Sequence, residues 1–198
     1  AMDLDGSTGF NYIRDIRSLD DFNGIWNVRL NDLGDEFMIS SDQIGLLPEE
    51  IHFGVVNINE RKVTLNFLNQ EVRVSNNFNS AYDIKIIAGD KEYVESMSKD
   101  ILSTIPEEFA LGQNYPNPFN PVTNMDYTLP QRSRVTISIY NVLGQEIKNL
   151  VNGEQDYGFH SISWDGTDMN GREVSSGVYF TQMRSTSFSQ TKKMLLLK

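Results

Sequence analysis

The residues that could carry catalytic chemistry are few. The chain has 198 residues but only two histidines and no cysteine, and the histidines, His52 and His160, stand in different halves. The chain therefore offers almost no residues from which to build a Ser-His-Asp triad, a multi-histidine metal centre or a cysteine nucleophile. His160 alternates with Ile162 and Trp164, a spacing that favours a structural place on a sheet face.

Carboxylates are abundant, with 27 Asp and Glu residues in the chain, and a pair of carboxylates is what glycoside hydrolysis requires. Most of them are spread along the first half in the manner of solvated side chains. We therefore expect no enzyme active site in this chain.

Two segments carry oxygen ligands at suggestive spacing. Asp3-Leu-Asp5-Gly resembles the start of a calcium loop, but it lacks a third oxygen ligand before the glycine and no acid follows until Asp15. Calcium at Asp3 and Asp5 and a solvated, metal-free end both stay open, and no other cofactor is expected. In the second segment, Asp165-Gly and Asn170-Gly171 are typical of tight turns, which we favour over ligands for Asp165, Asp168 and Asn170.

Charge divides the chain into two halves. The net charge is −10 and the isoelectric point is about 4.6, which argues against a nucleic-acid partner because phosphate binding needs a basic face. Residues 1–108 hold 20 acids and 9 bases, whereas residues 109–198 hold 7 acids and 8 bases. The absence of cysteine says little about compartment, and no apolar run approaches the roughly 18 residues of a membrane-spanning helix.

Prolines mark the same boundary. Four of the six prolines fall at positions 106, 116, 118 and 121, and each favours extended backbone at and before its position. We predict a first domain over residues 1–104, a Pro-rich and protease-sensitive linker over 105–122, and a second domain over 123–198.

Hydrophobic periodicity is two in both halves, which predicts an all-β protein made of two consecutive β-sandwich domains. In the second half, Val135, Ile137 and Ile139 alternate with polar or amphipathic residues. The strands expected there cover residues 125–129, 134–141, 146–151, 159–164, 177–184 and 191–197. Those expected in the first half cover 25–30, 36–40, 51–58, 62–68, 72–75, 82–88 and 91–97, with a short helix within 12–22 as an alternative.

An ordered set of motifs runs through the second half. It begins near Phe109 with Leu111-Gly-Gln-Asn-Tyr-Pro-Asn-Pro-Phe-Asn-Pro121, continues through Tyr140-Asn-Val-Leu-Gly-Gln145 and Trp164-Asp-Gly166, and closes with Ser176-Gly-Val-Tyr179 and Lys193-Met-Leu-Leu-Leu-Lys198. This set resembles the type A C-terminal sorting domain of proteins that the type IX secretion system of Bacteroidetes-like bacteria exports. It is also similar to the Ig-like domain of flagellar hook-capping proteins.

The resemblance implies a role in delivery. Proteins with such a domain cross the periplasm, are recognised by the outer-membrane translocon, and are attached to the cell surface by a sortase-like enzyme or released. The chain is thus expected to be the C-terminal piece of a secreted or cell-surface protein, with an Ig-like second domain and with any catalytic domain upstream of this chain. By position, the recognised signal corresponds to Gly171, Gly177, Tyr179, Lys193, Met194, Leu195, Leu196, Leu197 and Lys198.

The first half is similar only in general character to β-rich modules that precede such domains. The simplest interpretation is a spacer. The alternative is a carbohydrate-binding or adhesion module of a secreted multidomain hydrolase, which would bind polysaccharide through aromatic side chains such as Trp26, Phe37 or Tyr93. Alternating aromatics in a sandwich more often belong to the core, and an exposed aromatic row would be needed for the alternative.

Overall fold

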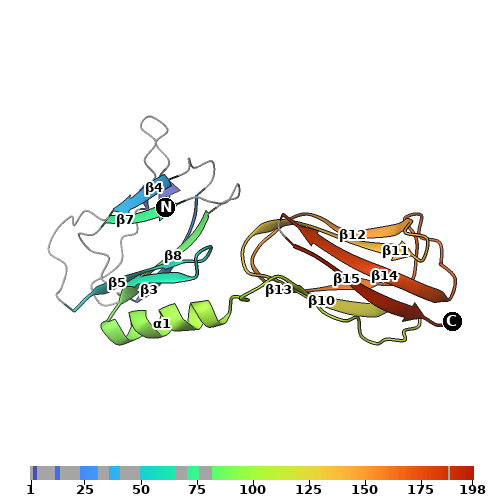
Figure 1. Cartoon of the computed structure of the whole chain (residues 1–198). Helices are drawn as coiled ribbons and strands as arrows, with labels where there is room; N and C mark the ends of the chain where they lie inside the picture. Colours follow the sequence, from blue (N-terminus) through green and yellow to red (C-terminus); the bar gives the residue numbers. More distant parts are fainter. Residues whose placement is uncertain are drawn as a thin grey trace.

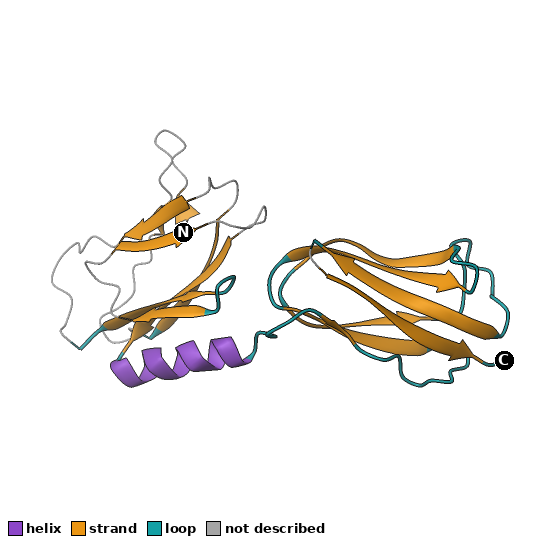
Figure 2. Cartoon of the chain, in the orientation of Figure 1, coloured by secondary structure: helices purple, strands orange, loops and turns teal. Residues whose placement is uncertain are grey.

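The computed structural model describes residues 2–3, 12–13, 23–30, 36–40, 50–65, 71–75, 82–186 and 188–198. Two strand-rich units follow one another, and the first carries the helix (Figures 1 and 2). The all-β prediction is confirmed, with this helix as the exception among the described elements.

The second unit is a sandwich of two antiparallel sheets. The three-stranded sheet has the order β13-β10-β9, and the four-stranded sheet has the order β12-β11-β14-β15. Figure 1 shows the two sheets facing each other. The strands are β9 (Ala110–Leu111), β10 (Thr123–Leu129), β11 (Ser133–Asn141), β12 (Glu146–Gln155), β13 (Gly158–Trp164), β14 (Gly177–Ser185) and β15 (Phe188–Leu196).

Alternation of apolar and polar residues builds the core of this sandwich. In β11 the side chains of Val135, Ile137 and Ile139 are fully buried, as their period of two predicts. They face Met125 and Leu129 of β10, which are buried too. Burying a side chain of this size stabilises the fold by about 1.5–3 kcal/mol, so the two inner faces supply the main stabilising term of the unit.

The first unit is built around a four-stranded antiparallel sheet of order β3-β8-β5-β6. A pair β4-β7 and a short pair β1-β2 accompany it. The strands are β1 (Met2–Asp3), β2 (Tyr12–Ile13), β3 (Gly24–Leu30), β4 (Glu36–Ser40), β5 (His52–Asn57), β6 (Lys62–Leu65), β7 (Glu71–Ser75) and β8 (Tyr82–Gly89). Helix α1 (Lys91–Ser103) packs on β5 and β8, on one face of the four-stranded sheet (Figure 1).

The strand predicted over residues 91–97 is wrong, because this segment begins α1. Asp90 caps the helix, its carboxylate accepting a hydrogen bond of 2.7 Å from the Tyr93 backbone N–H. Tyr93 and Met97 would share a face in a strand or in a helix, but the apolar Val94 between them breaks strand alternation. Val94, Met97 and Ile101 have helical spacing and pack in the core. The alternative helix within residues 12–22 lies largely outside the described residues.

A glycine lets this helix approach the sheet. A Cβ atom built on Gly54 of β5 would come within 2.8 Å of Val94 Cγ1, closer than packed carbon atoms allow. Val94, Val56 and Ile87 are fully buried where helix and sheet meet. The first unit therefore has a helix against the sheet face that a sandwich would cover with strands.

The segment 110–121 differs from the exposed connector that its prolines predict. Ala110–Leu111 forms β9, and the side chain of Phe119 is only 2% exposed within the sandwich core. The backbone of Phe119 bonds to the terminal strand, with Phe119 N–H donating to the Leu195 carbonyl at 3.0 Å. Prolines favour extended backbone, and here that backbone packs on a sheet edge. The domain limits stay a prediction, but this segment belongs structurally to the second unit.

Arg61 fixes the short stretch that joins the two units. Its guanidinium donates to the carbonyls of Ile105 at 2.6 Å, Pro106 at 3.0 Å and Leu102 at 3.3 Å. Arg61 also holds a φ of 53°, a conformation that glycine adopts more cheaply. A charged residue at such a position indicates that its side-chain contacts offset the backbone cost.

Two contacts connect the second unit to this stretch and to the first unit. The Thr128 hydroxyl of β10 donates to the Glu108 carbonyl at 2.9 Å. The side chain of Tyr157, between β12 and β13, packs against the apolar cluster of the first unit that contains Ile58 and Ile105. The two units therefore meet through named contacts as well as through the chain that joins them.

Phe119→Ala tests whether segment 110–121 is part of the second unit. We expect the substitution to lower the free energy of unfolding by about 3–5 kcal/mol, because it empties a core position. Urea denaturation followed by fluorescence measures the change. Tyr115→Ala is the matched control, since the Tyr115 side chain in the same segment is 81% exposed. Equal effects of the two substitutions would show that the segment is a linker.

Arg61→Ala tests the junction. Removing the guanidinium frees the Ile105 and Pro106 carbonyls, and we expect a glutamate-specific protease to cut after the exposed Glu107 and Glu108 roughly fivefold faster or more. The rate of appearance of the two fragments on a gel is the measurement. Lys62→Ala, which removes an exposed cation beside Arg61, should leave the rate unchanged. An unaltered rate in Arg61→Ala contradicts the role assigned to the guanidinium.

Candidate functional site

The terminal strand β15 holds most of the predicted signal residues. It pairs with β14 so that Tyr179 lies opposite Met194 and Gly177 opposite Leu196. Met194 and Leu196 are fully buried, Lys193 is exposed and Leu197 is 49% exposed. The six terminal residues predicted as a signal therefore serve in part as core and in part as surface.

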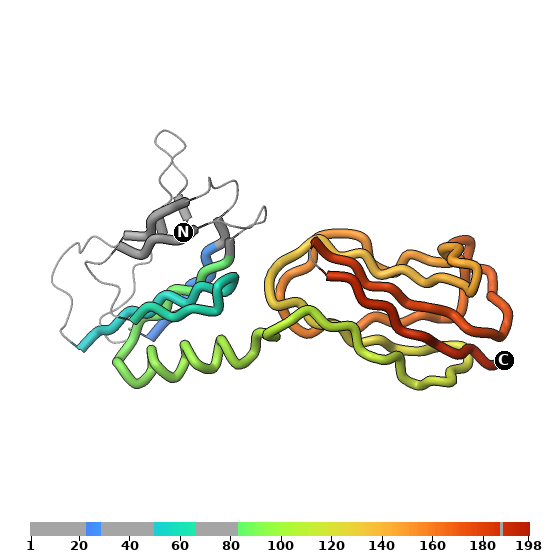
Figure 3. Tube along the Cα trace, viewed as in Figure 1, coloured from blue at the N-terminus to red at the C-terminus, as the bar shows by residue number. Residues whose placement is uncertain are grey.

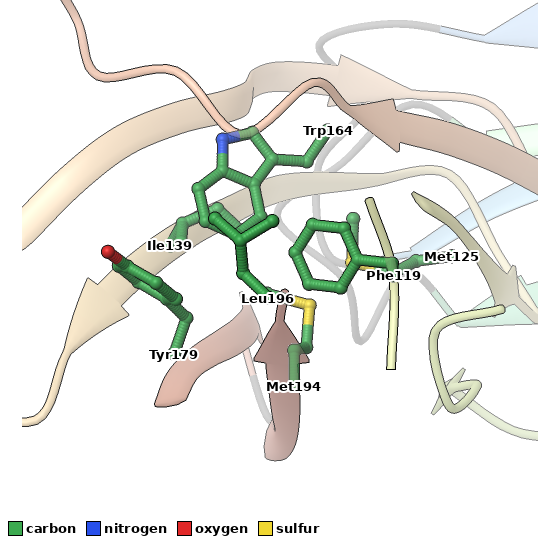
Figure 4. Packing of buried hydrophobic residues seen from close by; sticks show 7 residues of the cluster. All are labelled: Phe119, Met125, Ile139, Trp164, Tyr179, Met194 and Leu196. Atoms are coloured by element: carbon green, nitrogen blue, oxygen red, sulfur yellow. The ribbon is translucent and has the colours of Figure 1, made fainter. Parts of the chain in front are cut away.

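The buried signal residues pack against aromatic rings (Figure 4). The rings of Phe119 and Trp164 have centroids 5.5 Å apart, and those of Trp164 and Tyr179 meet edge to face at 5.1 Å. Met194 and Leu196 complete the same cluster. Aromatic pairs in these arrangements add about 0.5–1.5 kcal/mol to the gain from burial.

The outer edge of β15 is covered by the segment that opens the domain. The Gln113 side chain donates to the Lys193 carbonyl at 2.8 Å, and the Asn117 Oδ1 accepts from the Leu195 backbone N–H at 3.0 Å. The Leu197 N–H then donates to the Phe119 carbonyl at 2.9 Å. Residues 113–119 thus occupy the outer edge of β15, and we call them the edge clamp. An uncovered strand edge can pair with other chains.

The remaining predicted residues lie near the end of this strand. The Lys198 ammonium pairs with Glu173 at 2.9 Å, and its backbone N–H donates to the Ser176 hydroxyl at 3.0 Å. The Tyr179 hydroxyl donates to the Ser175 carbonyl at 2.8 Å. Gly171 has a φ of 74° in a turn, and its backbone N–H donates to the Asp168 carbonyl. The structure thus brings Gly177, Tyr179 and residues 193–198 together, with Gly171 in the neighbouring loop.

The loop after Trp164 is organised by two aspartates. Asp165 accepts hydrogen bonds from the Thr167 hydroxyl at 2.6 Å and from the Lys148 ammonium at 3.0 Å. The Thr167 hydroxyl, followed by Lys148, holds the pKa of Asp165 at about 2, although partial burial opposes this shift. The Trp164 indole N–H donates to the Thr167 carbonyl at 2.9 Å, so the loop also orients the core tryptophan.

The second aspartate closes the following turn. Asp168 accepts from the backbone N–H groups of Asn170 and Arg172 at 2.8 and 2.9 Å, and pairs with the Arg172 guanidinium. The hydrogen bond from the Arg172 backbone, followed by its side chain, lowers the pKa of Asp168. Each aspartate thus accepts hydrogen bonds within its own turn and pairs with one cation.

Metal-binding geometry is not found in the described part of the chain, where no three His, Asp or Glu side chains converge. The calcium candidate Asp5 and the side chain of Asp3 lie outside the described residues. His160 stacks on Tyr127 with ring centroids 4.9 Å apart and donates from Nε2 to the Asp156 carbonyl at 2.8 Å, which places it on a sheet face.

The aromatics proposed for polysaccharide binding are distributed differently. Tyr93 packs against the apolar cluster beneath α1, Trp26 is half-buried in β3, and the side chain of Phe37 lies outside the described residues. A cavity of about 360 Å³ at the junction is lined by residues of both units, among them Arg61, Glu108 and Phe159. The described residues include no helix that is long and apolar enough to cross a membrane.

Sequence reasoning missed the edge clamp. Its residues stood inside the motif Leu111 to Pro121, but the prolines there predicted a linker, and nothing in the local spacing identifies the partner of Gln113 some 80 positions later. Gln190 was missed too, although its Oε1 accepts from the Leu111 N–H at 2.7 Å. The repeated Asn and Gln side chains among the prolines were the available signal, because they can bond to an exposed strand edge.

Residues 121–189 match the family model of the FlgD Ig-like domain. The Ig-like fold predicted for the second half is thereby confirmed. No curated protein matches the chain.

Several solved structures, among them FlgD, PorZ and PorU, are similar to parts of the chain. FlgD of P. aeruginosa is 24% identical with a TM-score of 0.31, covering 37% of this chain and 58% of that one. PorZ, an essential surface component of the type IX secretion system of Porphyromonas gingivalis, is 13% identical with a TM-score of 0.32, covering 57% and 14%. Dimeric latent PorU of the same organism is 16% identical with a TM-score of 0.38, covering 81% and 14%. The chain thus spans 58% of the first structure and 14% of each of the others.

Asp165→Asn tests the loop through its pH dependence. The folded pKa of about 2 lies below the usual value of about 3.9, so the ionised carboxylate stabilises the fold above pH 4 and this contribution is lost as the pH falls towards 2. We expect the variant to be less stable at pH 7 and to lose less stability between pH 4 and 2. Thermal unfolding at several pH values measures both.

Asp126→Asn is the matched control, because it removes an exposed carboxylate of β10 outside this loop. It should leave the stability at pH 7 and its acid dependence close to those of the original chain. If Asp165→Asn behaves like this control, the bonds from Thr167 and Lys148 do not stabilise the loop as described.

Proposed function

We propose that residues 109–198 form a type A C-terminal sorting domain that the outer-membrane translocon of a type IX secretion system recognises. The observation that carries the proposal is the ordered motif set from Leu111 to Lys198. Its first and last members are joined in the structure by the edge clamp on β15. The first and last motifs therefore depend on each other for folding. This is what we expect if the translocon recognises the whole folded domain.

In this proposal the protein crosses the periplasm, and the translocon and a sortase-like enzyme are its partners. The outcome is attachment to the cell surface or release. The proposed signal consists of Gly171, Gly177, Tyr179 and residues 193–198. Met194, Leu196 and Tyr179 are buried, so we assign them to holding the strand, and we assign direct recognition to exposed groups such as Lys193 and Leu197.

The first unit acts as a spacer in this proposal. Tyr157 of the second unit packs against its apolar cluster, and Arg61 bonds the joining stretch at Ile105 and Pro106 to the first unit. A polysaccharide-binding role for this unit has less support, because Tyr93 belongs to the apolar packing of α1 and an exposed aromatic row is what such binding needs.

An export assay tests the proposal. The full chain is fused behind a periplasm-targeted fluorescent protein in a bacterium with a type IX system, and surface fluorescence is measured by flow cytometry. We expect the fusion to reach the surface and deletion of residues 193–198 to keep it in the periplasm. Because this deletion also removes Met194 and Leu196 from the core, a second variant is needed that leaves the core intact.

The double substitution Lys193→Ala and Lys198→Ala is that variant. It changes exposed side chains of the signal, one of which pairs with Glu173, and we expect surface fluorescence to fall severalfold while the protein stays folded. Lys91→Ala with Lys99→Ala removes the same charge from exposed positions of α1 and should export normally. Normal export of the deletion, or failure of the original fusion to leave the periplasm, would refute the sorting function.

A further inference from the structure

A shallow cavity of about 340 Å³ lies on the outer face of the four-stranded sheet of the second unit. Tyr179, Thr181 and Met183 of β14 are buried in the core, so the residues between them face outward. Figure 3 shows β14 and β15 side by side, in the reds of the C-terminal end. The lining of the cavity includes Tyr140, Phe180, Gln182, Arg184 and Thr191. We call it the sheet cavity, and none of these five residues belongs to the proposed sorting signal.

Two aromatic side chains lie at one end of the sheet cavity. Tyr140 of β11 and Phe180 of β14 are directly opposite each other in the strand pairing, which places their Cβ atoms about 4.5–5.5 Å apart. Both side chains are half-buried. The Tyr140 hydroxyl donates to Glu146 Oε2 at 3.3 Å, which holds the ring in place. This end therefore offers a flat apolar patch at the sheet surface.

The middle of the sheet cavity carries neutral polar groups. Gln182 and Thr191 are opposite each other on β14 and β15, and Gln182 Nε2 donates to Thr191 Oγ1 at 3.2 Å. This bond leaves the Gln182 carbonyl oxygen as an acceptor and the Thr191 hydroxyl proton as a donor. A ligand with hydroxyl groups can bond to both.

A guanidinium stands at the other end. Arg184 is exposed, and it has no side-chain hydrogen bond or ion pair with another described residue. Its planar fork can bind one carboxylate through two parallel hydrogen bonds. Four positions of β14 separate Phe180 from Arg184, which is roughly 13 Å along the strand. The cavity is thus suited to an elongated ligand with an apolar ring face at one end and an anion at the other.

The charges of this sheet face favour an anionic ligand. Three of its bases are exposed and have no ion pair within the described residues: Arg134, Arg184 and Lys193. Of the two acids on the face, Glu154 pairs with Arg132 at 3.5 Å. The other acid, Glu146, lies opposite Tyr140 at the aromatic end, away from Arg184. Residues 109–198 hold 7 acids and 8 bases, so this half of the chain does not repel an anion as the first half would.

We propose that the sheet cavity binds an acidic oligosaccharide, a short chain of sugars that carry carboxylates. The C–H groups on one face of a sugar ring are apolar and slightly positive, and they pack on the negative faces of Tyr140 and Phe180. Gln182 and Thr191 bond to sugar hydroxyls, and Arg184 binds a carboxylate. This site is separate from the polysaccharide hypothesis for the first unit, and it does not depend on the sorting function.

The geometry favours a saccharide over a peptide or a nucleic acid. β14 lies between β11 and β15, so both of its edges are paired and a peptide would gain no backbone pairing there. A nucleic acid carries a phosphate at every nucleotide and needs a basic track beside its stacked bases. Here Glu146 lies at the aromatic end, where those bases would stack.

The test is isothermal titration calorimetry of the full chain with a trimer of galacturonic acid and with its methyl ester. The ester keeps the rings and hydroxyls but has no charge. We expect the acid to bind, and Arg184→Ala to weaken its binding by roughly tenfold or more while changing little for the ester. Phe180→Leu keeps an apolar side chain but removes the ring, so it should weaken acid and ester alike, by roughly fivefold.

Two matched variants serve as controls. Arg134→Ala removes the same charge from the same sheet face outside the sheet cavity, and Phe159→Leu removes an exposed ring from β13. Both should bind the acid as the original chain does. All four variants should keep the thermal midpoint of the original to within a few degrees, since none changes a fully buried side chain.

Several outcomes would overturn the proposal. One is that the original chain binds neither this trimer nor a trimer of mannuronic acid. A second is that acid and ester bind equally well, and a third is that Arg134→Ala weakens binding as much as Arg184→Ala, which would indicate general attraction between charges. The last is tighter binding of a single-stranded DNA oligonucleotide at about 0.15 M salt, which would assign the cavity to nucleic acid.

Discussion

The second unit depends on the burial of Met194 and Leu196 among Phe119, Trp164 and Tyr179. These side chains come from the segment before β10 and from β13, β14 and β15, so one cluster joins both sheets and both ends of the domain. The edge clamp reinforces this burial from outside, because its Gln, Asn and backbone groups occupy the free edge of β15. Without this packing the terminal strand would have an open edge on one side and an incomplete core beneath it.

The same strand explains how one short segment serves both stability and recognition. A period of two sends Met194 and Leu196 inward and leaves Lys193 and Leu197 outside. In the proposed function, the inward residues make the fold and the outward residues are available to a partner. The aspartate turns after Trp164 support the packing of this strand, since Asp165 orients the loop that bonds to the tryptophan and pairs with the Lys148 ammonium.

Prediction from sequence succeeded where the residue pattern within one element is enough to determine its structure. The alternation of Val135, Ile137 and Ile139 identified a strand because the pleat alone fixes which side chains are buried. It failed over residues 91–97, where Tyr93 and Met97 fit both a strand and a helix and the capping role of Asp90 decided between them. The clamp and the Arg61 junction could not be predicted, since their partners are backbone C=O and N–H groups distant in sequence, and nearly every residue offers both.

The clamp also sets an order of events during synthesis. Gln113 must wait for a carbonyl that the ribosome adds 80 positions later, and Asn117 waits almost as long for its own partner. Residues 113–119 therefore lack their partners on β15 and in the core until β15 has been synthesised. Contacts of such long sequence separation form slowly. A chain whose translation stops before residue 193 would have neither a closed sandwich nor an ordered terminal strand. The domain can therefore complete its fold only after its last strand has been translated.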